Sequence, residues 1–320
     1  MFVLLGCLAA IVLAALLVLL VKEAHRQGKR TPDHEQESTY RDTASGKSEP
    51  FGSLAAEPSV DISFVVPMYN EEERLPIMMD EAITYIKKRT AREAGFKCEF
   101  ILVDDGSRDG TVEVAEGIAR SNPECTIRIL RLHQNHGKGG AVRKGMLRAS
   151  GRLLLMVDAD GATKIDDLEK LEKRLSDAAL GVAVGSRAHL AADSVAERSL
   201  FRTILMRGFH LFVHVISGVR GIEDTQCGFK LFTRRAARCL FPNQHIERWA
   251  FDVELLYLAA RQFVPLHEVA VNWQEIDGSK LDVASDSIQM ARDLLLIRFC
   301  YFTGLWSLES PDGKETKKKN

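Results

Sequence analysis

The sequence predicts an α/β protein with a mostly parallel, doubly wound sheet. Apolar runs of strand length alternate with amphipathic stretches of helix length from residue 60 to residue 175. This alternation is typical of parallel strands that are covered by helices on both faces. Four of the runs end in polar clusters, and ligands bind at the carboxyl ends of the strands in such sheets. With 320 residues and 46% hydrophobic content, the chain can bury one large core or two smaller ones.

The predicted elements follow one another in order along the chain. We expect strands that end at Val66, Val103, Leu132 and Val157, and a further strand from Gly181 to Gly185. We expect helices between them over about 71–93, 110–120, 139–149 and 165–175. The polar clusters that follow the first four strands should therefore meet along one edge of the sheet and form one crevice of nucleotide size.

The first 21 residues are continuously apolar apart from Gly6 and Cys7, which is long enough to cross a bilayer as a helix. No basic stretch precedes them and no small-residue cleavage site follows, so we favour an uncleaved anchor over a cleaved signal peptide or a buried helix. Basic residues follow the span and none precedes it: Lys22, Arg26, Lys29 and Arg30. The positive-inside rule therefore predicts a single-pass protein whose remaining chain is cytosolic.

Four regions are predicted along the chain. Residues 1–21 form the transmembrane anchor, 22–59 a basic juxtamembrane segment and flexible linker, 60–308 the folded domain, and 309–320 a polar, basic tail. Two amphipathic stretches lie inside the domain. The stretch 196–219 suits a membrane surface or a packed core equally well, and 293–306 carries aromatic residues suited to a membrane interface.

Charge and cysteine content narrow the class of protein. The net charge of −1 gives no indication of a nucleic-acid partner. Six scattered cysteines without a CxxC pair indicate reduced thiols and no disulfide or zinc framework. His133 and His136 have the spacing HxxH, but without a carboxylate partner this pattern is more often structural, so we expect neither a zinc site nor a metalloprotease.

An acidic pair, Asp158 and Asp160, directly follows the apolar run that ends at Val157. Strand alternation puts both carboxylates on one side, where they can bind a divalent cation that itself holds phosphate oxygens. The run that begins at Gly137 lacks the third glycine of a dinucleotide fingerprint, and no Gly-Lys-Ser/Thr closes a P-loop. The sequence therefore favours a nucleotide held by strand ends and a metal, and disfavours a dehydrogenase or a P-loop NTPase.

Several sequence blocks occur in a family-specific order. They are Pro67-Met68-Tyr69-Asn70-Glu71, Val103-Asp104-Asp105-Gly106-Ser107 and Asp158-Ala159-Asp160, with further blocks over 135–142, 224–232, 250–254 and 272–280. Together these blocks resemble inverting glycosyltransferases of the GT-A fold, within the branch that glycosylates polyprenyl phosphates. The resemblance covers roughly residues 60–300 and includes the N-terminal anchor.

The resemblance implies transfer of glucose from UDP-glucose to dolichyl phosphate with inversion, as a step in protein N-glycosylation. It implies catalysis at the cytosolic face of the endoplasmic reticulum membrane, with Mg²⁺ or Mn²⁺ bound by Asp158 and Asp160. Two alternatives remain open at this point. One is a mannosyltransferase that uses GDP-mannose on the same scaffold, and the other is a non-catalytic membrane scaffold that binds nucleotide sugars.

The resemblance also assigns residues to the donor. Pro67, Tyr69, Asn70 and Glu71 are expected to line the nucleoside pocket, although Asn70 could instead cap a helix at a strand-to-helix turn. Asp105 is expected to hydrogen-bond the uracil or ribose. Lys138 and Lys280 are expected to face the diphosphate.

The acceptor side is assigned in the same way. Arg187 and Arg202 are expected to hold the acceptor phosphate, with Gln226 and Lys230 close to the sugar. A phosphate monoester is largely dianionic at neutral pH, because its second pKa is about 6, so no general base is required. Asp252 and Glu254 open a predicted helix and are either catalytic or first-turn carboxylates stabilised by the helix dipole.

Overall fold

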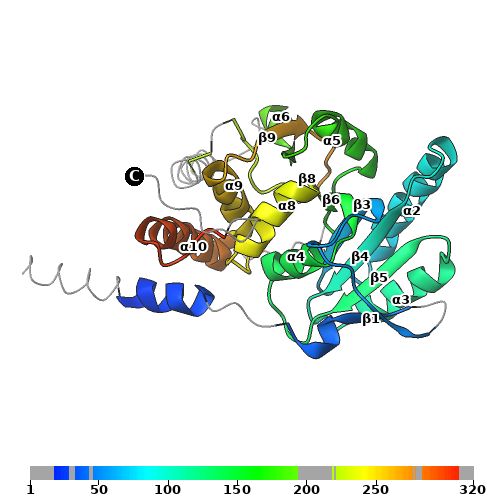
Figure 1. Cartoon of the computed structure of the whole chain (residues 1–320), viewed down its shortest axis with the longest axis horizontal. Coiled ribbons are helices and arrows are strands. Elements are labelled where there is room, and N and C mark those ends of the chain that lie inside the picture. The colour runs from blue at the N-terminus through cyan, green and yellow to red at the C-terminus, as the bar shows by residue number, and fades with distance from the viewer. Residues whose placement is uncertain are drawn as a thin grey trace, which may run out of the picture.

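The structure, a computed structural model, describes residues 18–28, 33–42, 46–193, 218–219, 221–276, 278 and 283–309. A seven-stranded sheet forms its centre, in the order β5-β4-β3-β6-β8-β7-β9 (Figure 1). The strands are β3 (Val60–Met68), β4 (Cys98–Asp104), β5 (Thr126–Arg131), β6 (Gly151–Met156), β7 (Val182–Ser186), β8 (Lys230–Thr233) and β9 (Leu266–Ala270). The helices are α2 (Leu75–Arg92), α3 (Thr111–Ser121), α4 (Lys138–Leu147), α5 (Leu168–Leu175), α6 (Ala188–Asp193), α8 (Arg234–Leu240), α9 (Phe251–Arg261) and α10 (Val283–Thr303), with short 3-10 turns η1 (Glu35–Glu37), η2 (Ile165–Asp167) and η4 (Phe241–Asn243).

The prediction of a mostly parallel sheet is confirmed. Strands β3, β4, β5 and β6 pair in parallel, and so do β7 and β9. Strand β8 was not predicted, and it runs antiparallel between β6 and β7. Lys230, the first residue of β8, therefore lies opposite Met156 at the carboxyl end of β6. The reversal brings the loop before β8 to the same edge of the sheet as the polar clusters.

Two apolar layers cover the sheet because neighbouring strand residues point to opposite faces. Phe64 and Phe100 face a cluster made with α2, α3 and α5, whereas Val65 and Ile101 face a second cluster made with α4, α8, α9 and α10. The rings of Phe64 and Phe100 stack with centroids 4.7 Å apart. This arrangement is the doubly wound sandwich that the sequence predicted, and the helices leave the carboxyl edge of the sheet open for a site.

The first helix begins later than predicted. Helix α2 starts at Leu75 rather than near residue 71, with Arg74 in the cap position and a proline in its first turn. Asn70 has a left-handed backbone with φ of 53°, and the backbone N–H of Glu71 donates to Thr111 Oγ1 at 2.7 Å. The strand-to-helix turn is thus tied to the turn before α3, and Asn70 is not a helix cap.

Much of the segment 22–59, for which the sequence predicts a flexible linker, has regular secondary structure where the structure describes it. Residues 18–28 are helical, η1 follows, and β1 (Thr39–Arg41) pairs antiparallel with β2 (Ser48–Pro50). Glu37 is fully buried, and its carboxylate accepts from Lys144 Nζ at 2.6 Å. The local sequence could not reveal this docking, because Lys144 comes from α4, more than one hundred residues further along the chain.

None of the helices within the described residues combines the length and the apolar character needed to cross a membrane. The predicted anchor lies almost wholly in residues 1–17, and the stretch 196–217 also lies outside the described residues. Helix α10, expected at a membrane interface, buries Leu294, Ile297 and Cys300 against the core. Its outer side exposes large apolar side chains at seven-residue intervals, Ile288, Leu295 and Phe302.

We predict that adding one methyl group between α4 and the sheet destabilises the protein. A Cβ at Gly145 would lie 2.5 Å from Val65 Cγ1 and 2.7 Å from Val103 Cγ2, so Gly145→Ala should lower the free energy of unfolding by about 1–3 kcal/mol. The matched control is Gly117→Ala in α3, where nothing lies within 4 Å of the added atom. That change should raise the free energy of unfolding by about 0.5–1 kcal/mol. Chemical denaturation of both variants measures the difference, and an unchanged or stabilised Gly145→Ala protein would contradict the close packing of α4.

Candidate active site

A cavity of about 540 Å³ opens at the carboxyl edge of the sheet. Its walls include most of the residues predicted for the site: Pro67, Tyr69, Glu71, Asp105, Lys138, Asp158, Asp160, Arg187 and Gln226. These residues come from the end of β3, from the loops that follow β3, β4, β6 and β7, from the loop before β8, and from the first turn of α4. The topology thus brings residues together that are up to 159 positions apart in the sequence, Pro67 and Gln226.

The acidic pair is the centre of charge in this cavity. Lys138 Nζ lies 2.7 Å from Asp158 Oδ1 and donates to Oδ2 at 2.8 Å. Burial opposes the charged form of Lys138, but the charges of Asp158 and Asp252 outweigh this effect and raise the pKa of Lys138. Burial also raises the pKa of Asp160, and the neighbouring charge of Asp158 adds to the rise. A second positive charge would therefore stabilise the pair.

The residues present fit a divalent cation. Asp158 contacts the Lys138 ammonium through both carboxylate oxygens, and its Oδ1 is buried and makes no further hydrogen bond. Asp160 Oδ1 accepts from the nearby backbone N–H of Ala162 at 2.9 Å. Carboxylate oxygens are the ligands that Mg²⁺ and Mn²⁺ prefer, so Asp158 and Asp160 are suitable ligands.

Asp105 is held in place from the loop after β5. Its carboxylate accepts the backbone N–H groups of His136 at 2.7 Å and of Gly137 at 2.8 Å. Burial raises the pKa of Asp105 to about 6, although these two hydrogen bonds oppose the rise. The side chain is only 3% exposed and lines the cavity wall, so its protonation state is coupled to whatever binds there.

The turn after β3 is only partly a wall of the cavity. Glu71 and Arg74 both line it, and they form an ion pair at 2.7 Å. Asn70 does not line it; its side-chain oxygen accepts from the backbone N–H of Arg108 at 2.8 Å. Asn70 therefore shapes the turn, while Pro67, Tyr69 and Glu71 present surface to the cavity.

Arg187 has a fixed orientation on the opposite wall. Its guanidinium binds both oxygens of Asp224, at 2.7 and 2.9 Å, and lies 5.3 Å from the centre of the Trp273 ring. Burial opposes the charge on Arg187, yet the pairing with Asp224 dominates and raises the pKa of Arg187. Such a bidentate pair leaves a rigid, always charged group that is suited to a phosphate.

Lys230 lies beneath the cavity and is not part of its wall. It is fully buried, and its ammonium donates to Cys227 O at 2.6 Å and to Asp252 Oδ1 at 2.5 Å. Asp252 does line the cavity, so Lys230 acts on the site by positioning Asp252. Glu254 has a structural role, because its carboxylate accepts the backbone N–H groups of His245 and Ile246 at 2.9 and 2.7 Å.

Two predicted residues, Arg202 and Lys280, lie outside the described residues. Other wall residues were not predicted as site residues, among them Arg74, Asn135, Arg248, Trp249, Glu275 and Met290. Arg248 and Trp249 directly precede the sequence block over 250–254, and Glu275 lies within the block over 272–280. Asn135 also belonged to a family block, but nothing in the sequence alone showed that it faces the cavity.

The relatives of this chain agree with these features. The family model for glycosyl transferase family 2 matches residues 63–241, more than half of the chain. A dolichyl-phosphate beta-glucosyltransferase of Drosophila melanogaster is 50% identical over 98% of this chain and 97% of its own length. The chain belongs to the dolichyl-phosphate beta-glucosyltransferases of glycosyl transferase family 2. The family resemblance drawn from the sequence blocks is thereby confirmed.

Two further relatives in this family show how widely the match extends. The Homo sapiens protein of the same name is 48% identical over 99% of this chain and 98% of its own length. The Saccharomyces cerevisiae protein of that name is 42% identical over 77% of this chain and 76% of its own length. The matches to the Drosophila melanogaster and Homo sapiens proteins cover nearly the whole chain and therefore include the cavity walls and the N-terminal region.

Solved structures share the fold at low sequence identity. Glucosyl-3-phosphoglycerate synthase from Mycobacterium tuberculosis, in complex with Mn²⁺ and UDP-glucose, superposes with a TM-score of 0.52. It is 16% identical and covers 75% of this chain and 79% of that chain. At this identity the likeness establishes the GT-A-like α/β fold and nothing more.

We predict that Gly228 is required because it leaves room for Asp158. A Cβ at this position would lie 2.0 Å from Asp158 Oδ2, so Gly228→Ala must displace the carboxylate. Binding of Mn²⁺ together with UDP should weaken by about tenfold or more, because one carboxylate ligand is misplaced. Electron paramagnetic resonance of free Mn²⁺ measures the change, with Gly117→Ala as the control. Unchanged Mn²⁺ binding in a folded Gly228→Ala protein would show that Asp158 is not a ligand.

Proposed function

We propose that this protein transfers glucose from UDP-glucose to dolichyl phosphate with inversion and forms dolichyl β-D-glucosyl phosphate. The observation that carries the proposal is the cavity at the sheet edge, where an acidic pair, a lysine and a rigid arginine converge. Membership of the dolichyl-phosphate beta-glucosyltransferases supports the choice of sugar and acceptor. The product would serve as a glucose donor in the assembly of the lipid-linked oligosaccharide used for N-glycosylation.

The donor is assigned to the wall made by β3, β4 and α4. Pro67 and Tyr69 flank the nucleoside, and Asp105 accepts a hydrogen bond from uracil or ribose. Lys138 lies in the first turn of α4, where backbone N–H groups and the helix dipole favour phosphate oxygens. When the diphosphate binds, the Lys138 ammonium is close enough to exchange its contact with Asp158 for a phosphate oxygen.

A bound Mg²⁺ or Mn²⁺ ion, held by Asp158 and Asp160, would neutralise the charge that builds on the departing UDP. The protein residues around the pair keep both carboxylates in place. Asp158 lies against the backbone of Gly228 and contacts Lys138, and Asp160 accepts the Ala162 backbone N–H. This support makes the electrostatic environment of the leaving group rigid before the substrate arrives, as transition-state stabilisation requires.

The acceptor is assigned to the wall that contains Arg187, Gln226 and Arg248. Its phosphate is a dianion near neutral pH and can attack the anomeric carbon directly, so the protein need only place it. Asp252, which also faces the cavity, is bound to Lys230 and is therefore poorly suited to remove a proton. Attack from the side opposite UDP inverts the configuration at the anomeric carbon, without a covalent intermediate.

The proposed acceptor, dolichyl phosphate, carries a lipid chain that lies in a bilayer, so an enzyme that uses it works at a membrane surface. We propose a single-pass protein of the endoplasmic reticulum membrane whose cavity faces the cytosol, with the apolar N-terminus as the anchor. The described helix over 18–28 exposes Val18, Leu19 and Val21, and α10 exposes Ile288 and Phe302. Apolar side chains on both helices are compatible with contact to acyl chains.

We predict that lipid-soluble product forms from UDP-glucose and not from GDP-mannose. The purified full-length chain is incubated with dolichyl phosphate and with each radiolabelled nucleotide sugar in turn, in the presence of Mn²⁺. Asp158→Asn and Asp160→Asn should each lower the rate by on the order of 10²-fold or more. Each change weakens binding of the metal ion that would neutralise the negative charge on the departing UDP. An excess of EDTA should have the same effect.

The controls separate the rival functions. Asp109→Asn changes an acid of the neighbouring turn that does not line the cavity, and it should keep most of the activity. Label transferred only from GDP-mannose would establish the mannosyltransferase instead. Binding of UDP-glucose without any transfer would support the non-catalytic scaffold, and full activity in EDTA would contradict the metal assignment.

We predict that the affinity for uridine falls as the pH is lowered through about 6. The folded-state pKa of Asp105 is raised to about 6, so its carboxylate is the main form at pH 7 and the neutral acid is the main form at pH 5. If only the carboxylate accepts the nucleoside hydrogen bond, the apparent Kd at pH 5 is about tenfold above its neutral-pH plateau. Uridine carries no phosphate and does not itself titrate in this range, so calorimetry reports on the protein.

The matched variants for this titration are neighbours in the same loop. Asp105→Asn should bind uridine weakly with little dependence on pH, whereas Asp104→Asn should keep the wild-type profile. Asp104 is the appropriate control because it is also buried but accepts from the backbone N–H of Ser107 and does not line the cavity. A profile that is unchanged in Asp105→Asn would remove Asp105 from the nucleoside pocket.

A further inference from the structure

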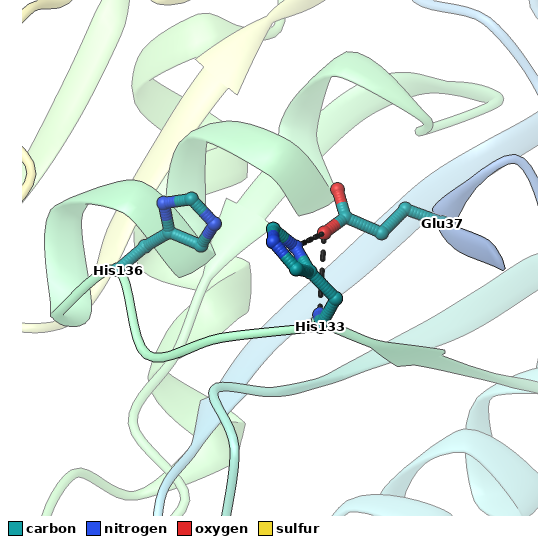
Figure 2. Close-up of side chains that lie close together, drawn as sticks. All are labelled: Glu37, His133 and His136. Atoms are coloured by element: carbon teal, nitrogen blue, oxygen red, sulfur yellow. Dashed lines mark hydrogen bonds and ion pairs between the residues drawn. The ribbon is translucent and has the colours of Figure 1, made fainter. Parts of the chain in front are cut away.

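Two histidines and a glutamate converge beside the loop from β5 to α4. Glu37 comes from η1, whereas His133 and His136 both come from the loop, and Figure 2 shows the His133 ring between the other two side chains. One potential ligand atom from each residue lies within 4.8 Å of the other two. The HxxH pair that lacked a carboxylate partner in the local sequence thus acquires one from 96 residues upstream.

His136 has a buried nitrogen without a partner. Its side chain is 1% exposed, and Nδ1 lies 3.3 Å from Glu247 Oε1, which fixes the orientation of the ring. The other nitrogen, Nε2, is buried and makes no hydrogen bond. In Figure 2 the ring presents this edge towards His133. A buried polar atom without a partner is unfavourable, so the arrangement is better explained if a further atom binds there.

The spacing of the other two side chains suits a tetrahedral ion. His133 Nδ1 and Glu37 Oε1 are 3.1 Å apart. Two ligands that each lie about 2.0 Å from a zinc ion at a tetrahedral angle are about 3.3 Å apart, so this pair needs little movement to share an ion. Glu37 Oε2 remains with Lys144 at 2.6 Å, which holds the carboxylate in place.

Packing alone leaves part of the cluster unexplained. The His34 ring stacks on the His133 ring with centroids 4.8 Å apart, and His133 Nδ1 contacts Glu37 Oε1. These two contacts explain the position of the His133 ring without a metal ion. Neither contact reaches His136 Nε2. The Glu247 contact to Nδ1 has the form in which a carboxylate orients a metal-binding imidazole through its second nitrogen.

We propose that Glu37, His133 and His136 bind a divalent transition-metal cation of the Zn²⁺ class. Two imidazole nitrogens and one carboxylate oxygen favour zinc over the oxygen-seeking Mg²⁺, so this ion differs in kind from the one assigned to Asp158 and Asp160. The His133 side chain is 31% exposed, which provides a path from solvent and space for water as a fourth ligand. His136 lines a separate cavity of about 570 Å³, and none of the three residues lines the donor cavity.

The ion would fasten the N-terminal segment to the donor site. Glu37 lies between the helix over 18–28 and the β1–β2 hairpin, and the backbone N–H groups of His136 and Gly137 hold Asp105. An ion bound to the cluster therefore fixes the segment that leads from the predicted anchor against the loop that positions a donor-binding carboxylate. Its role is structural, and it does not depend on which sugar or acceptor the enzyme uses.

The test is zinc binding to the full-length, tag-free chain. Asp158→Asn and Asp160→Asn are introduced in every protein so that the acidic pair cannot bind the metal, and ZnCl₂ is titrated by calorimetry after dialysis against EDTA. We expect one Zn²⁺ per chain, and we expect His133→Gln and His136→Gln each to weaken binding by about tenfold or more. His267→Gln is the matched control, because His267 lies on β9 at the opposite edge of the sheet from β5, and it should bind as the parent does.

Limited proteolysis tests whether the ion holds the N-terminal segment against the rest of the domain. Trypsin should cleave after the exposed Arg41 more slowly when Zn²⁺ is present, and this protection should disappear in His136→Gln. If a histidine variant fails to fold, Co²⁺ is added instead to the protein with the unmutated cluster, and its visible absorption is measured. Nitrogen and oxygen ligands in a tetrahedral site give Co²⁺ a strong band. Absence of that band, or equal Zn²⁺ binding by the folded histidine variants and their parent, would overturn the proposal.

Discussion

The charge arrangement at the carboxyl end of β6 is the constraint on which the site depends. Two carboxylates, Asp158 and Asp160, are partly buried next to each other, and the ammonium of Lys138 compensates only one of them directly. Like charges in a protected site raise the cost of ionisation unless cations are close. This excess of negative charge lowers the stability of the folded protein, and it makes the site a favourable place for a divalent cation.

The reversed strand β8 extends this site towards the wall that contains Arg187 and Gln226. Because β8 runs antiparallel between β6 and β7, the loop that contains Gln226 and Gly228 reaches the edge where Asp158 lies. Lys230 then falls just below the surface and holds Asp252, while Arg187 leaves β7 on the same side. A purely parallel sheet would have sent the loop before this strand to the opposite edge, so the cavity wall that contains Gln226 requires the reversal.

The sequence predicted the parallel strands β3, β4, β5, β6 and β7 and the helices between them well, because local periodicity and polar residues at the strand ends specify them. It missed the parallel edge strand β9 and the antiparallel β8, which has four residues and contains the fully buried Lys230. A charged residue in so short a run interrupts the apolar pattern by which a strand is predicted. Lys230 can be buried because it pairs with Asp252, which the local sequence does not show. The docking of Glu37 was missed for a related reason, since Lys144, His133 and Arg148 lie far along the chain.

The sequence by itself determined the class of fold, the family and the identity of the acidic pair, because these depend on periodicity and on the order of short blocks. Only the tertiary structure decided which polar residues face the cavity. Asn70 turned out to shape a turn, Lys230 to support Asp252 from below, and Arg248 to join the wall. Burial and hydrogen bonding between distant segments set these roles, and neither quantity is contained in the local order of residues.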